Sequence, residues 1–129
     1  MKFVYLIARI LLGLTFAFFG SNLLFHFLPQ PPFPPGPAKD FFTALGVTHY
    51  TAVIGFFQLL PGLLLLIGRY VPLALTILAA EIVNILTSHI LIIHGGLFPV
   101  PILVVILWLL VFWQVRSAFA GIFQAKVPV

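Results

Sequence analysis

Hydrophobic positions in this chain gather into four long runs, separated by short polar or proline-rich breaks. The runs cover residues 3–27, 50–67, 71–93 and 97–115. A bilayer core needs roughly 20 mostly apolar residues per helix, and each run is close to that length. None alternates strictly, as barrel strands would, and lipid offers no partners for unpaired backbone groups. The pattern predicts an all-α membrane protein: a single domain over 1–129 containing a four-transmembrane-helix bundle.

Basic residues lie unevenly around these runs. Four helices place both termini on one side, and that side carries Lys2, Arg9, Arg69, Arg116 and Lys126. The other side carries only Lys39, which Asp40 offsets. Cytoplasmic loops are enriched in Lys and Arg, so we expect both termini to be cytoplasmic.

Composition narrows the function classes. The chain is 63% hydrophobic and 6% charged, with a mean hydropathy of +1.27. Its net charge of +4 is scattered rather than gathered into a patch, so we expect contact with the lipid bilayer and not with nucleic acid. Cysteine is absent, which excludes thiolate catalysis and Cys-ligated metal or iron–sulfur sites.

A proline-rich segment connects the first two runs. Six prolines lie between Pro29 and Pro37, which predicts a stiff, extended outer strap within residues 28–46. After Pro37, the apolar residues at 38, 41, 42 and 45 share one helical face, and Gly46 suits a helix end. We therefore expect a short interfacial helix that acts as a lid over the bundle or, alternatively, as a substrate gate.

Small and polar residues indicate which helix faces look inward, because close packing in lipid depends on small side chains. In the third run, Thr76, Ala80, Asn84 and Ser88 recur at steps of four and predict a polar inner face. The expected packing positions in the first two runs are Gly13, Ala17, Gly20, Gly55 and Gly62.

Ionised residues inside the runs suggest a polar cluster. Arg9 and Glu81 are the only two, and helix rise places Arg9, Gln58 and Glu81 at depths that an Arg side chain can bridge. We expect Arg9, Gln58, Glu81 and Asn84 to form a cluster in the cytoplasmic half of the core, acting as a structural clamp or as a functional site.

Histidines mark the outer side. His26, His49, His89 and His94 all fall near the outer ends of their runs. They can anchor the helices at the interface, and imidazole can also hydrogen-bond a quinone. We name Asn22, His26 and His89 as candidate ligand contacts. We expect no metal site, and haem is disfavoured because the histidines have no ligand spacing.

The fourth run differs from the others. It has no small residue from Ile102 to Val115. Its aromatic residues Trp108, Phe112 and Trp113 therefore predict a face turned to lipid or to a protein partner.

Several segments resemble the DoxX family of small four-helix bacterial membrane proteins. They are RILLGL at 9–14, HFLPQPPFPP at 26–35, GLLLLIGRYVPLAL at 62–75 and IVNIL at 82–86 with His89. Positions that match the family pattern are Arg9, Gly13, Gly20, His26, Gly62, Gly68, Asn84 and His89. Gln58 stands where the family typically has Glu, and Glu81 stands where an apolar residue or Pro is usual.

The resemblance implies a multi-pass protein of a bacterial or archaeal cytoplasmic (inner) membrane. Some relatives resemble membrane subunits of quinone-linked oxidoreductases, so we expect an anchor, assembly or quinone-wall element that binds a protein partner and is not catalytic alone. One alternative is a small homo-oligomeric transporter or channel with a polar core. Another is a freestanding quinone-reactive oxidoreductase. Quinone is the one cofactor compatible with these expectations.

Overall fold

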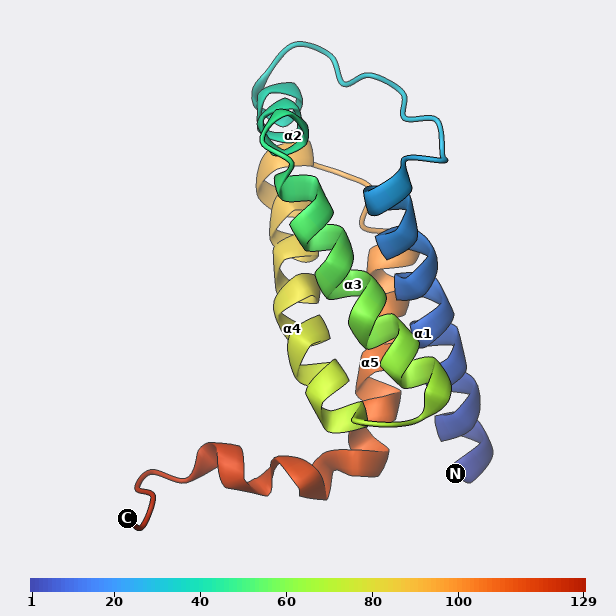
Figure 1. Cartoon of the computed structure of the whole chain (residues 1–129), viewed down its shortest axis with the longest axis vertical. Coiled ribbons are helices and arrows are strands. Elements are labelled where there is room, and N and C mark those ends of the chain that lie inside the picture. The colour runs from blue at the N-terminus through green and yellow to red at the C-terminus, as the bar shows by residue number, and fades with distance from the viewer.

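The chain is entirely helical. The computed structural model describes residues 1–129, with no strands and four helices long and apolar enough to span a membrane. The elements are α1 (Lys2–Phe25), α2 (Pro37–Val47), α3 (Tyr50–Ile67), α4 (Val71–Ser88), the π-helix η1 (His89–Ile93), α5 (Val100–Val115) and the 3-10 helix η2 (Arg116–Phe123). The long helices run roughly along one axis (Figure 1). The all-α prediction is confirmed, and the chain is a multi-pass membrane protein.

Backbone contact joins α1 to α3, the most extensive helix pair of the bundle. A Cβ atom placed on Gly62 would lie 2.6 Å from the Ala17 backbone nitrogen. A Cβ on Gly20 would lie 2.8 Å from the Gly55 carbonyl oxygen, and one on Gly13 would lie 2.9 Å from that of Gly62. The structure thus brings the five expected packing positions together, because only small residues permit such an approach.

Apolar side chains fill the centre of the bundle. Leu12, Leu65, Leu75, Leu78 and Val111 are fully buried and come from all four spanning helices. Because these residues lie toward the end of the bundle that holds the termini, that half of the interior is packed with hydrocarbon rather than with polar groups.

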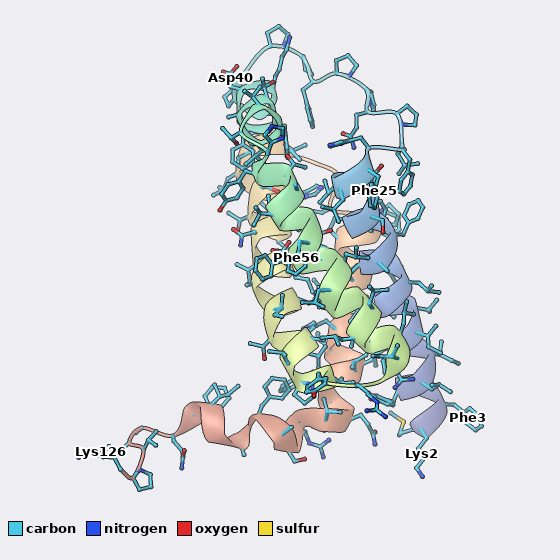
Figure 2. All side chains as sticks on the ribbon, viewed as in Figure 1. Lys2, Phe3, Phe25, Asp40, Phe56 and Lys126 are labelled. Carbon is cyan, nitrogen blue, oxygen red and sulfur yellow. The ribbon has the colours of Figure 1, made fainter.

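Two shorter elements lie at the opposite ends of the bundle. At one end, the loop before α2 folds over that helix, and Phe33 stacks on Phe42 with ring centroids 5.1 Å apart. At the other end, η2 turns away from the bundle axis, and both termini lie there (Figure 1). Lys2 and Lys126 are consequently at the end opposite Asp40 (Figure 2).

Helix bounds differ from the expected runs at three ends. α1 ends at Phe25, where His26 takes a left-handed conformation with φ 52°. α5 begins at Val100 instead of Leu97, since residues 94–99 form the preceding loop and turn. The third run continues to Ile93, but its last five residues form a π-helix that begins at His89.

The α1–α3 contact can be tested by adding one methyl group. Gly62→Ala should lower the free energy of unfolding by about 1–3 kcal/mol, because the new Cβ meets backbone that cannot move aside. Thermal unfolding in lipid nanodiscs measures the change. Gly46→Ala in α2 is the matched control, since its Cβ would meet nothing within 4 Å. Equal melting temperatures for the two variants would contradict the close contact.

Candidate functional site

A cavity of about 420 Å³ opens among α1, α3, η1 and the start of α5. Its apolar wall includes Phe16, Phe19, Ile85 and Val104. Polar side chains from α1, the proline-rich loop, α3 and η1 interrupt this wall: Thr15, Asn22, Gln30, Gln58 and His89. Small-molecule sites typically measure about 300–1,000 Å³ and combine an apolar lining with a few polar groups. The cavity has that character.

His89 begins the π-helix and lies against this cavity. Its Nδ1 atom is 2.7 Å from the Ile85 carbonyl oxygen. A carbonyl oxygen can only accept, so Nδ1 carries a hydrogen, and in this tautomer of the uncharged ring Nε2 is an acceptor. Nε2 lies beside Gly96, 3.7 Å from where a Cβ of that residue would stand. π-helical turns occur frequently at functional sites, and this one brings an acceptor to the cavity wall.

Asn22 connects the cavity to the proline-rich loop. The side chain is 5% exposed, and its Oδ1 accepts a hydrogen bond from the Leu28 backbone N–H at 2.8 Å. Its Nδ2 group makes no hydrogen bond within the chain and remains a free donor at the cavity. Gln30, two residues further along the loop, also lines the cavity. The loop therefore forms part of the cavity wall, which the sequence analysis did not predict.

Gln58 separates the cavity from Glu81. Its side chain is 6% exposed, and its Nε2 donates to the Glu81 Oε1 at 3.2 Å. The expected pairing of these two residues is present. Gln58, however, also lines the cavity. We had expected it only in a polar cluster in the cytoplasmic half of the core.

Arg9 does not join this pair, contrary to our expectation. Its guanidinium contacts Gly68 in the turn between α3 and α4, and it lies 5.6 Å from the centroid of the Tyr5 ring. Its buried Nε atom has no hydrogen-bond partner. The Arg side chain runs toward the end of the bundle where charge can reach the membrane surface, as basic side chains in membranes commonly do.

Asn84 is also outside the expected cluster. Its Nδ2 donates to the Ala80 carbonyl oxygen of the same helix at 2.9 Å, and the residue is exposed. Thr76 and Ala80 are exposed as well, so this stripe of α4 faces outward and the predicted polar inner face is wrong for it. The physical reason is that a polar side chain can bond a carbonyl of its own helix, as Thr76 does with Pro72.

The aromatic residues of α5 divide between two environments. Trp108 Nε1 donates to the Leu75 carbonyl oxygen at 2.9 Å, and the ring stacks on Phe112. Phe112 in turn packs against the buried Phe119 of η2. These two half-buried residues therefore pack against α4 and η2, and the face toward lipid or a partner stays a prediction. Trp113 alone is exposed, at 59%, with Arg116 over its ring.

The remaining histidines occupy turns. His26, His49 and His94 have φ values of 52°, 61° and 60° and are exposed. His26 does not line the cavity, whereas the other two candidate contacts, Asn22 and His89, do. No group of three His, Asp or Glu side chains is arranged to hold a metal ion.

This arrangement can hold a flat, largely apolar molecule that carries hydrogen-bonding groups at its edge. His89 offers an acceptor, Asn22 a donor, and Gln58 an amide that is already oriented by Glu81. Comparison with known proteins adds no assignment, since no family model, curated protein or solved structure matches the chain.

Double-mutant cycles test which polar groups act together. Gln58→Leu and Glu81→Leu should show a coupling free energy of about 0.5–3 kcal/mol, because each loses the same hydrogen bond. Arg9→Met and Glu81→Leu should be additive within about 0.5 kcal/mol, since Arg9 contacts the α3–α4 turn instead. Unfolding in mixed micelles measures both cycles. Strong coupling between Arg9 and Glu81 would contradict the separation of Arg9 from the Gln58–Glu81 pair.

Proposed function

We propose that this chain is a DoxX-like membrane subunit whose cavity binds the ring of a quinone and forms the protein wall for a partner's redox chemistry. The observation that carries the proposal is the free acceptor of His89 at one side of an apolar cavity, with Asn22 and Gln58 as further polar contacts. DoxX membership rests on the segments quoted above.

The cavity residues fit such a ring. Phe16, Phe19 and Val104 offer apolar surface to its faces. The hydroxyl of a reduced quinol can donate to His89 Nε2, and the carbonyl of an oxidised quinone can accept from Asn22 Nδ2. When bound, a quinone supplies two-electron, two-proton redox chemistry. The role of the chain is to bind and orient the ring.

Catalysis would depend on a partner. The chain offers no cysteine and no group of three metal ligands to hold a redox centre, so we assign electron transfer to a partner. A partner that carries electrons would have to approach the outer end, where the cavity lies. The subunit would then anchor that partner, assist its assembly or provide one wall of a shared quinone site, and a freestanding oxidoreductase is less well supported.

Orientation follows from charge. Five of the six basic residues belong to the α1 start, the α3–α4 turn or the C-terminal segment, which together form one end of the bundle. We assign that end to the cytoplasm, which places α2, the strap and the cavity at the outer face of a bacterial or archaeal inner membrane. In this orientation α2 lies in the outer interface.

A channel or transporter is the less favoured function. A conducting path needs polar groups or water through the whole membrane. Fully buried leucines from α1, α3 and α4 fill the interior on the cytoplasmic side of Gln58. This packing supports a closed-ended binding cavity over a pathway.

Quinone binding tests the proposal directly. A short-chain ubiquinone or menaquinone analogue should bind the protein in nanodiscs, and His89→Phe should weaken binding about tenfold through loss of one hydrogen bond. Equilibrium dialysis of the analogue gives the affinities. His94→Phe is the matched control, because His94 is exposed and outside the cavity. Equal binding by the two variants, or none by the native protein, would refute the site.

A further inference from the structure

One face of α4 carries polar side chains and has no neighbour within the chain. Thr76, Ala80 and Asn84 are exposed on this face, whereas the buried residues of the helix, Ala74, Leu75, Leu78 and Ile82, lie on the opposite side. Glu81 lies at its edge. Thr76 bonds a carbonyl of its own helix, but a polar atom that faces lipid without a partner is unfavourable, so unused hydrogen-bonding capacity on this face indicates a missing neighbour.

Asn84 is the centre of this face. One amide hydrogen bonds the Ala80 carbonyl oxygen of its own helix, and the Oδ1 atom accepts no hydrogen bond. One turn away, Glu81 is only half-buried, and its bond from Gln58 involves Oε1 alone. An amide acceptor and a carboxyl oxygen therefore lie near each other at membrane depth with hydrogen-bonding capacity unused.

We propose that a second copy of this chain covers the face, with α4 packed against α4 about a two-fold axis along the membrane normal. Copies inserted in the same orientation place identical residues at identical depths. Asn84 of one copy then faces Asn84 of the other, and an amide is self-complementary because it both donates and accepts. Ala80 and Thr76, one and two turns away on the same face, allow the backbones to approach closely.

A second copy supplies a hydrogen-bonding partner for Asn84 at the right membrane depth more directly than an unrelated protein does. Another protein would need its own polar group at the depth of Asn84, whereas a second copy supplies one automatically. The pairing also has a consequence for the cavity. Glu81, which orients Gln58, would lie beside the interface and become covered by the second copy, so dimer formation would stabilise the polar wall of the cavity from outside the chain.

Cysteine cross-linking in the native membrane gives the first test. The chain has no cysteine, so each variant reports on one position only. Ala80→Cys should form a symmetric disulfide-linked dimer under mild oxidation. Ile106→Cys on α5 is the control, being 49% exposed on another helix, and should remain monomeric. Equal cross-linking at both positions, absence of a dimer, or cross-linking of Ala80→Cys to a different protein would overturn the proposal.

Substitution of Asn84 supplies the second test. Asn84→Leu should raise the dimer dissociation constant about 3- to 30-fold in lipid vesicles, as measured by dilution with fluorescently labelled protein. Asn84→Gln keeps the amide and should retain most of the affinity. An unchanged helix content by circular dichroism separates weakened association from unfolding. An unchanged dissociation constant for Asn84→Leu would contradict the pairing of the two amides.

Discussion

The backbone contact between α1 and α3 determines where the rest of the structure lies. Gly13 and Gly20 on one helix meet Gly55 and Gly62 on the other, so closely that a Cβ added to any of them would lie less than 3.0 Å from a main-chain atom. Neither helix can rotate or shift without a backbone clash, because larger residues at these positions would overlap main-chain atoms. Asn22 and Gln58 are therefore held at fixed positions relative to each other, and α4 and α5 complete the cavity around them.

The second constraint is the lack of water in the membrane interior. Polar side chains must find partners within the protein, and this chain uses two solutions. Thr76 and Asn84 each donate one hydrogen bond to a carbonyl of their own helix, which lowers the cost of facing outward but leaves the Asn84 Oδ1 atom without a donor. Gln58 and Glu81 bond each other across two helices, which holds α3 and α4 together beside the cavity. The bonds within α4 leave an exposed polar face on that helix. The bond between Gln58 and Glu81 fixes a polar group in the wall of the cavity.

The sequence predicted the spanning helices well, because the length and composition of an apolar run decide membrane insertion almost alone. Small-residue spacing also identified the positions at which α1 and α3 meet. The sequence did not predict which side of α4 faces the interior of the bundle. The step-of-four stripe through Asn84 is equally compatible with either face, since its hydrogen bonds are local. Arg9 extends toward Gly68. Counting residues along a helix gives the depth of Arg9 but not the direction in which its side chain points, so this contact could not be predicted. The cavity itself required the loop at Gln30 and the π-turn at His89, and neither has a periodic signal.

Photoaffinity labelling with an azido-quinone in native membranes would show whether the cavity is a quinone site. Cross-linked peptides should then map to the cavity wall, around Phe16 and Phe19 in α1 and around Val104 in α5. An excess of unlabelled quinone should suppress this labelling. Label spread over the lipid-facing residues of all four helices, and insensitive to competition, would contradict it.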